Sequence, residues 1–440
     1  MRKFASFFGF EKSQTNIKTE ISAGLATFLT MSYIIFVQPA VLSAAGMDKG
    51  AVFTATCLSS AIACFIMGFY ANYPIAQAPL MGENFFFAYT VVLAMGYSWQ
   101  KALSLVFISG VLFLILTFTR IREKLVNSVP DCIKYSIAAG IGLFIALIGL
   151  KEGGIIIPEA STMMKLGNLH SKPAIISLTG LLVISVLFSR GVKAAVLWGI
   201  LCSALLSFFM GLTTFNGIFS FPPSLEPTFM KFDLRGILSP DSIPIIIIFL
   251  FMALFDTLGT LVGVGIQAGL MKNGKLKRVS KALVSDAFAT TIGAILGTST
   301  VSSYIESGVG VANGGRTGFV AVVVGILFLL SLCISPLVSF VNVSVKSGNA
   351  LFHPATAPAL IFVGALMIGS IKHINWNDFS EYAPAFITMT FIPFTYNIAE
   401  GIAFGFISYS AIKGFSGKGK EVSPLMWVLS VLFLAGLFLL

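Results

Sequence analysis

The sequence is short of charge. Only 10% of its 440 residues are Asp, Glu, Lys or Arg, whereas 56% are hydrophobic. A soluble globular domain carries about 25% charged residues, which keep its surface hydrated. The charges gather in short clusters, and the apolar stretches between them approach the ~20 residues that a helix needs to cross a bilayer. This composition argues against a soluble protein and predicts an all-α, polytopic membrane protein.

Signals for metal binding and enzymatic catalysis are also missing. The five cysteines form no Cys-x-x-Cys pair, and four lie inside apolar stretches, which is typical of buried thiols. The three histidines lie in a loop or near polar boundaries. The sequence contains neither a His-Glu-x-x-His zinc motif nor a nucleophile elbow. We therefore expect no metal, no cofactor and no enzymatic activity.

The net charge of +10 does not indicate a nucleic-acid partner, because the sequence has no separate basic domain. Basic clusters near 120–124, 272–281 and 413–420 instead lie in short loops beside apolar segments, as in cytoplasmic loops of membrane proteins. Residues 1–20 are polar and lack the small-residue cleavage site of a secretory signal. We expect a multi-pass protein embedded in the lipid bilayer of the inner (plasma) membrane, with a cytoplasmic N-terminus.

Fourteen apolar segments follow one another along the chain, and a fifteenth at about 425–440 either spans the membrane or lies in its interface. The fourteen are 21–43, 51–71, 79–95, 101–120, 131–150, 173–190, 193–213, 243–267, 282–297, 301–313, 317–341, 351–371, 382–395 and 397–413. With the N-terminus inside, the Lys and Arg residues of the short loops fall mainly on the inner side.

Two of these segments are too irregular for ordinary helices. Around 72–87 the chain is interrupted by Pro74, Pro79 and Gly82, and around 297–317 it is rich in Gly, Ser and Thr. Irregular backbone at membrane depth is tolerated where it is buried in protein or lines a cavity. These are the third and tenth segments, seven apart, as expected for two inverted seven-segment repeats. Matching breaks in inverted repeats indicate the substrate site of a transporter.

Five carboxylates lie within or beside the apolar segments: Glu83, Asp256, Asp286, Glu306 and Glu400. A carboxylate at the centre of a membrane helix costs roughly 2.5–3.5 kcal/mol on insertion scales, so most of those that occur there are functional. Asp256 lies in the middle of the eighth segment and Glu306 in the broken tenth. Asp286 and Glu400 lie near the ends of predicted segments, so we expect their carboxylates to reach water.

The residues around these carboxylates suit a planar heterocycle. Asn84 offers both a donor and an acceptor, and Thr260 shares a helical face with Asp256. Gly82 interrupts the third segment, and aromatic residues whose rings can stack on a heterocycle are close in sequence to Asn84, Asp256 and Glu306. We predict as substrate-binding residues Asn84, Asp256, Glu306, Thr260, Gly82, Phe85, Phe255 and Tyr304. The alternative for 297–315 is a Ser/Thr/Gly-rich packing interface between helices.

Several stretches resemble the AzgA-like purine permeases, which belong with the nucleobase–cation symporters of the nucleobase–ascorbate type. One is Phe-Asp-Thr-Leu-Gly-Thr-Leu-Val-Gly-Val at 255–264, and another is Gly-Thr-Ser-Thr-Val-Ser-Ser-Tyr-Ile-Glu-Ser at 297–307. Further matching stretches are 27–39, 46–53, 70–76 and 401–409. The resemblance runs from about residue 15 to the C-terminus.

The resemblance implies fourteen spans in two inverted halves, 21–213 and 243–413, joined by an extracytoplasmic loop at 214–242. Core segments would occupy about 21–120 and 243–341, and gate segments about 131–213 and 351–413. Residues 414–440 would form a cytoplasmic linker and the last hydrophobic segment. Short extended pieces of the third and tenth segments would cross where core and gate meet and hold the base.

The family typically carries adenine, guanine and hypoxanthine with protons, and its substrate contacts match Asn84, Asp256 and Glu306. Family members usually have Ala-Pro-Gly-Met-Gly-Leu-Asn-Ala-Phe-Phe in the third segment, whereas this chain has Leu80, Glu83 and Phe85 at the differing positions of 78–87. These substitutions constrain the break, add a carboxylate and add bulk beside Asn84.

The hypothesis is therefore proton-coupled purine uptake by alternating access, with Glu306, Asp256 and Glu83 as proton-coupling candidates and sodium as the less favoured ion. The alternatives are another heterocycle such as xanthine or uracil, or an anion, on the same fold. A channel and a membrane-embedded enzyme fit the pattern less well. The sequence does not fix the oligomeric state, and a homodimer is one assembly that it allows.

Overall fold

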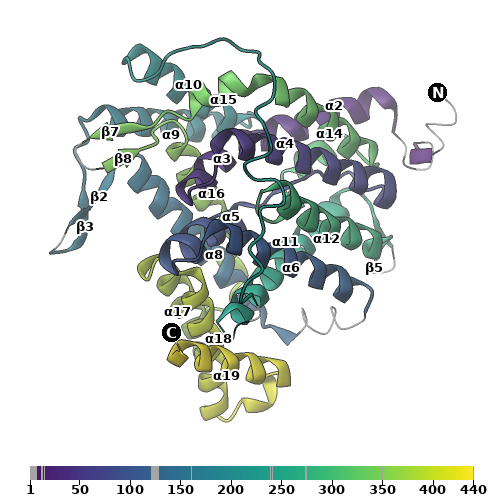
Figure 1. Cartoon of the computed structure of the whole chain (residues 1–440). Helices are drawn as coiled ribbons and strands as arrows, with labels where there is room; N and C mark the ends of the chain where they lie inside the picture. The colour runs from purple at the N-terminus through teal and green to yellow at the C-terminus, as the bar shows by residue number, and fades with distance from the viewer. Residues whose placement is uncertain are drawn as a thin grey trace.

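The chain forms one mainly helical body in the computed structural model (Figure 1). The described residues are 7–10, 13, 15–119, 128–159, 161–237, 239, 241–272, 275–347 and 350–439. The whole of the predicted basic cluster at 120–124 therefore lies outside the described residues, and so does part of the polar N-terminus.

Helices dominate both halves of the chain. Those of the first half are α2 (Ile17–Met31), α3 (Ile34–Ala44), α4 (Lys49–Ile66), α5 (Met81–Phe85), α6 (Trp99–Thr117), α8 (Asp131–Glu152), α9 (Lys172–Ser189) and α10 (Ala195–Phe209). Those of the second half are α11 (Ser242–Gln267), α12 (Val279–Leu296), α13 (Ser307–Ala312), α14 (Phe319–Ser331), α15 (Ser335–Val341), α16 (Ala357–Ile368), α17 (Phe379–Phe394), α18 (Ile398–Phe415) and α19 (Pro424–Leu439). Wider π-helical turns cover Met67–Ala71 and Phe86–Ala94.

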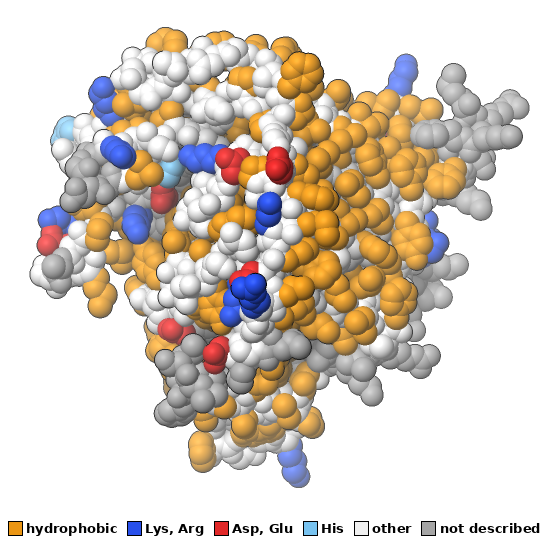
Figure 2. All heavy atoms as spheres, viewed as in Figure 1, with side chains coloured by type: hydrophobic (Ala, Val, Ile, Leu, Met, Phe, Trp, Pro, Cys, Tyr) orange, Lys and Arg blue, Asp and Glu red, His pale blue; other side chains and the backbone are white. Residues whose placement is uncertain are grey.

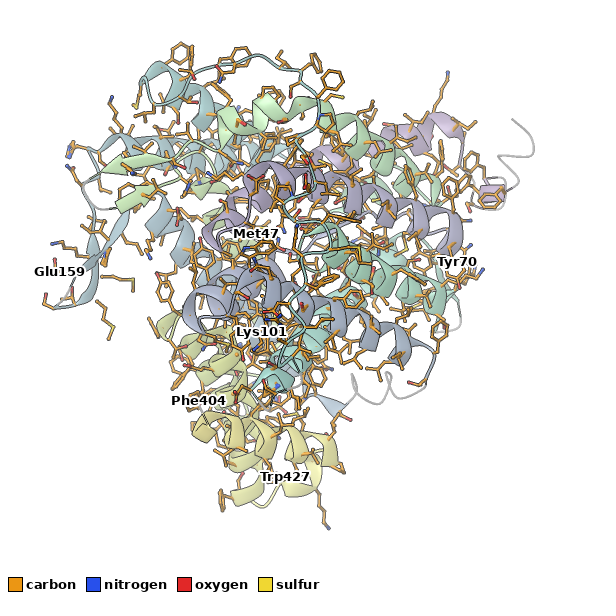
Figure 3. All side chains as sticks on the ribbon, viewed as in Figure 1. Met47, Tyr70, Lys101, Glu159, Phe404 and Trp427 are labelled. Atoms are coloured by element: carbon orange, nitrogen blue, oxygen red, sulfur yellow. The ribbon has the colours of Figure 1, made fainter. Side chains whose placement is uncertain are left out.

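Strands are few, short and paired only two by two among the described residues. They are β1 (Gln77–Pro79), β2 (Ile156–Glu159), β3 (Met163–Leu166), β4 (Met271–Lys272), β5 (Lys275–Leu276), β6 (Val301–Ser303), β7 (Val345–Ser347) and β8 (Ala350–Phe352). Three of the pairs are local hairpins, and the β2–β3 hairpin projects from the body with Glu159 near its tip (Figure 3). Among the described strand pairs, only β1–β6 joins the two halves of the chain.

The protein is a multi-pass membrane protein. Among the described residues, eight helical stretches are long and apolar enough to cross a bilayer, and three shorter apolar helices accompany them. Figure 2 shows a broad, nearly uncharged hydrophobic surface over the right-hand side of the view, where α4, α12 and α14 lie in Figure 1. Such a surface is stable against lipid, because acyl chains are as apolar as the side chains that they cover.

The helices pack in two groups. In one group, α12 lies against α4 and α6, and α14 lies against α2 and α4. In the other, α8 lies between α16 and α17, and α17 also packs against α18. Close helix contact depends on glycine at the α8–α16 crossing, where a Cβ added at Gly364 would overlap the carbonyl oxygen of Gly142. The substrate candidates lie where the two groups meet.

An extended segment, 212–237, crosses the first group of helices before α11 begins; it is the teal trace that descends through the centre of Figure 1. Thr54 on α4 donates to the Pro223 carbonyl at 2.9 Å, and the Met230 amide donates to the carbonyl of Ile295 on α12, also at 2.9 Å. The segment therefore ties helices of both halves together at one end of the group.

The first apolar segment differs from the prediction of one helix at 21–43. It begins earlier, at Ile17, because the Asn16 side chain accepts from the Thr19 amide at 3.0 Å and caps α2. It is also interrupted at Ser32 and Tyr33, which separate α2 from α3. The break places Tyr33 at the candidate substrate site described below.

Candidate substrate site

The two broken segments meet as an antiparallel pair of strands. In β1 and β6, Gln77 lies opposite Ser303 and Pro79 opposite Val301. Each strand leads into a short helix, α5 or α13, so both segments consist of a strand followed by a partial helix. Because strand and helix together satisfy the backbone, irregular chain is stable at this depth in the protein. The predicted breaks in the third and tenth segments are therefore present, and they are in contact.

Asp286 on α12 holds the two strands together. Its Oδ1 accepts from Gln77 Nε2 of β1 and from Ser303 Oγ of β6 at 2.8 Å, and its Oδ2 accepts from Ser302 Oγ at 2.8 Å. Ser302 is in turn 2.8 Å from Thr257 Oγ1 on α11. The expectation that Asp286 reaches water is wrong: it is fully buried, because α12 turns this residue toward the strand pair.

Asn84 and Glu83 on α5 are buried beside the strands, at 0% and 2% exposure. Ser299 Oγ donates to Asn84 Oδ1, whereas Asn84 Nδ2 and Glu83 Oε1 have no hydrogen-bond partner among the described residues. A buried polar atom without a partner costs roughly 1–3 kcal/mol unless a ligand or water satisfies it. Phe85 is buried and stacks on Tyr89, with ring centroids 5.3 Å apart.

Gly82 precedes these residues and lies close to the second helix group. A Cβ added there would lie 3.5 Å from Cγ2 of Ile141 on α8. An added methyl group at Gly82 would thus make ordinary van der Waals contact with α8, and the third segment contacts both groups of helices.

α11 contributes Asp256, which is exposed, and Thr260, which is 4% exposed although it is one turn away. A Cβ added at Gly259 would meet open space, so the helix is unpacked beside Asp256. Phe255 is partly buried and stacks on Phe251 at 5.6 Å. One face of α11 therefore supports the strand pair, while Asp256 on the adjacent face is exposed beside the unpacked Gly259.

Glu306 caps the start of α13 and is partly exposed. The hydroxyl of Tyr33, from the break between α2 and α3, donates to Glu306 Oε1 at 2.9 Å. Tyr304 is almost fully buried, and its hydroxyl donates to the Pro79 carbonyl at 2.5 Å, so this ring braces the two segments. Sequence reasoning missed Tyr33, whose only signal is a phenol hydroxyl in an apolar stretch.

Four carboxylates lie near one another at this place. Asp256 is within electrostatic range of Glu306 and of Asp286, and Glu83 is within range of Asp256. Glu400 lies outside the group: it is in the first turn of α18 and accepts from the Asn397 side chain at 2.9 Å.

Comparison with known proteins gives consistent matches over almost the whole chain. Residues 18–404 match the Xan_ur_permease model, described as Permease family. The chain is 51% identical over 435 residues to a putative permease of Methanocaldococcus jannaschii, MJ0326, covering 98% of each protein. It is 47% identical over 441 residues to the guanine/hypoxanthine permease PbuG of Bacillus subtilis, again covering 98% of each. It is 44% identical over 427 residues to the adenine permease AdeQ of Escherichia coli, covering 97% of this chain and 94% of AdeQ.

The fold is also similar to a solved transporter structure. The transmembrane domain of a cyanobacterial bicarbonate transporter, BicA, superimposes with a TM-score of 0.62 over 87% of this chain and 97% of that domain, at 14% sequence identity. The resemblance to AzgA-like permeases is confirmed by the sequence matches. The chain belongs to the Permease family of membrane transporters and is not an enzyme.

Proposed function

We propose that the protein takes up the purine nucleobases adenine, guanine and hypoxanthine together with protons, by alternating access. The observation that carries the proposal is the meeting of Asn84, Glu83, Asp256 and Glu306 around the β1–β6 pair. Relatives at 44–47% identity over nearly the full length are named as adenine and guanine/hypoxanthine permeases. Both arguments point to the same class of planar, hydrogen-bonding substrate.

The side chains suit the edge and the face of a purine. Carboxylate oxygens of Asp256 and Glu306 accept from ring and exocyclic N–H groups, and the free amide nitrogen of Asn84 donates to a ring acceptor. Phe255, partly accessible beside Asp256, is the ring placed to stack on the base. Phe85 and Tyr304 are buried, so we assign them to supporting the site from behind.

Proton coupling follows from the closeness of the carboxylates. Charges of the same sign in a poorly hydrated site repel one another, and a bound proton relieves that repulsion. We propose that one of Glu306, Asp256 and Glu83 takes a proton from outside, that substrate binds to this neutralised site, and that both leave on the inner side. A proton is favoured over sodium because this arrangement needs one neutralised carboxylate rather than a ligand cage of many oxygens.

We propose that movement occurs between the two groups of helices. The core would comprise α2–α6 and α11–α15, the gate α8–α10 and α16–α18, and fourteen crossings would form two inverted halves. The N-terminus would be cytoplasmic and the membrane the plasma membrane, in line with the basic residues of the predicted inner loops. A homodimer is the assembly that we propose to test by cross-linking in the membrane.

Uptake of labelled hypoxanthine, adenine, guanine, xanthine and uracil by cells that lack their own purine permeases tests the function. We expect accumulation of the first three that a protonophore abolishes. Asp256→Ala and Glu306→Ala should abolish uptake at an unchanged membrane level, whereas Glu400→Ala, a carboxylate outside the group, should retain it. Normal uptake in either of the first two variants would refute the assignment, and uptake of xanthine or uracil alone would redirect it.

A further inference from the structure

A buried chain of hydrogen bonds leads from α3 to Asn84. Gln38 on α3 is fully buried, and its Nε2 donates to Ser299 Oγ at 3.0 Å and to Thr298 Oγ1 at 2.9 Å. Ser299 is also fully buried, and its hydroxyl donates to Asn84 Oδ1. The chain therefore runs from Gln38 through Ser299 to Asn84, across three segments of the protein.

The direction of this chain fixes which atom Asn84 presents. An amide nitrogen donates and does not accept, so the Ser299 oxygen accepts from Gln38 and its one hydroxyl hydrogen is left for Asn84. That hydrogen needs an acceptor, which is Asn84 Oδ1. The other end of the amide, Nδ2, is then turned away from Ser299, and it is buried without a partner in the part of the chain that the structure describes. Asn84 is thus oriented to offer a donor.

The neighbouring residue offers the complementary atom. Glu83 is 2% exposed, and its Oε1 has no partner either. A carboxylate oxygen accepts hydrogen bonds. Two consecutive residues of α5 thus leave unpaired one donor, on Asn84, and one acceptor, on Glu83.

We propose, building on the purine function above, that the Gln38–Ser299–Asn84 chain together with Glu83 selects 6-oxopurines over adenine. Of the three proposed substrates, guanine and hypoxanthine share an O6 acceptor next to an N1–H donor, which matches Asn84 Nδ2 and Glu83 Oε1. Adenine carries an amino donor at position 6 and an acceptor at N1, so both contacts are mismatched. A buried donor that faces another donor is left unpaired, which is the strongest way for a site to reject an analogue.

Gln38 sets which groups donate and which accept along the hydrogen-bond chain from Gln38 to Asn84. Its Oε1 is buried without a partner, so its side chain contacts Ser299 through the nitrogen alone. A glutamate at this position accepts instead of donating, and the Ser299 hydroxyl then turns toward it. The Ser299 oxygen is left to accept from Asn84 Nδ2, and Asn84 presents Oδ1, an acceptor that suits the amino group of adenine. Q38E therefore reverses the pattern without touching Asn84.

Competition against uptake of labelled hypoxanthine measures the preference. In the wild type, unlabelled guanine should compete at about one tenth of the adenine concentration or less, since one mismatched buried contact is worth about tenfold or more. Ser299→Ala removes the hydroxyl that orients the Asn84 amide. The ratio of the adenine concentration to the guanine concentration that gives equal competition should then fall to within about threefold of unity. Gln38→Glu should move the ratio toward adenine by about tenfold, measured against labelled adenine if hypoxanthine is no longer carried.

Thr298→Val is the matched control, because Thr298 also accepts from Gln38 but does not contact Asn84. It should keep the wild-type ratio. Equal competition by adenine and guanine in the wild type would overturn the selectivity and leave purine transport standing. An unchanged ratio in both Ser299→Ala and Gln38→Glu would overturn the role of the chain. If no purine enters wild-type cells at all, the proposed function fails and this inference with it.

Discussion

Replacing Asp286 with alanine removes the carboxylate that joins the two broken segments. Ser302 keeps its contact with Thr257, so the donors left without a partner are those of Gln77 and Ser303. An orphaned buried donor costs roughly 1–3 kcal/mol, and two of them cost about 2–6 kcal/mol. If the cost falls on the conformation that binds substrate, the apparent affinity drops about 30-fold or more.

Asparagine at the same position separates hydrogen bonding from charge. In Asp286→Asn, the remaining oxygen still accepts from Gln77 and Ser303, and the new amide donates to the Ser302 oxygen, whose hydrogen turns to Thr257. Only the charge assistance is lost, about 1 kcal/mol or roughly fivefold in affinity. We therefore expect a much larger loss of apparent affinity in Asp286→Ala than in Asp286→Asn.

The assay is hypoxanthine uptake at a series of concentrations, with the amount of protein in the membrane measured in the same cells. Ser285→Ala is the matched control, because Ser285 is the buried neighbour on α12 whose hydroxyl bonds only to its own helix, at Lys281. An Asp286→Ala variant with KM within twofold of the wild type would refute the bracing role. Equal damage by asparagine and alanine would show that the charge, not the hydrogen bonds, is what matters.

Three further predictions follow from contacts elsewhere. Tyr33→Phe removes the donor to Glu306, so KM for uptake should rise about 5- to 30-fold, for about 1–2 kcal/mol lost; an unchanged KM would exclude a role for this hydroxyl. Gly364→Ala forces a Cβ into the facing backbone of α8, and the purified protein should lose roughly 1–3 kcal/mol of stability, seen as a lower Tm; an unchanged Tm would mean that the helices shift apart freely. A hydrogen bond from Lys418 holds the pKa of Asp378 below its usual range, so its contribution to stability is present above about pH 4 and is lost as the pH falls through the lowered pKa. The Tm of Asp378→Asn should therefore lie below the wild type at pH 7, and this gap should close in acid; a gap independent of pH would contradict it.

The breaks in the third and tenth segments were predictable because their causes are local. Pro79 lacks the amide that a helix needs, and the Gly- and Ser-rich stretch around 297–317 favours other backbone forms. Their placement seven segments apart, which the hydropathy pattern indicates, stays a prediction. The structure confirms that both segments are broken and shows that the two breaks pair.

The partners of the site residues were not predictable, because they depend on which distant residues meet. Asp286 looked like a residue near a helix end, yet its position on α12 turns it toward both strands. Tyr33 lies at a helix break that contains neither proline nor glycine, so the local sequence did not predict the break. The unpaired atoms of Asn84 and Glu83 likewise emerged only when every neighbouring donor and acceptor was placed.

The β1–β6 pair has a consequence for biogenesis, because it joins residue 77 to residue 303. A ribosome has made more than half of the chain before β6 exists, and until then the edge of β1 has no partner strand. Unpaired backbone groups are costly in a bilayer. Until β6 is made, the β1 edge in the first half of the chain must therefore be shielded from lipid by other helices or by the insertion machinery. The candidate substrate site is therefore among the last parts of the protein to be completed, and a chain truncated before the tenth segment is a natural target for membrane quality control.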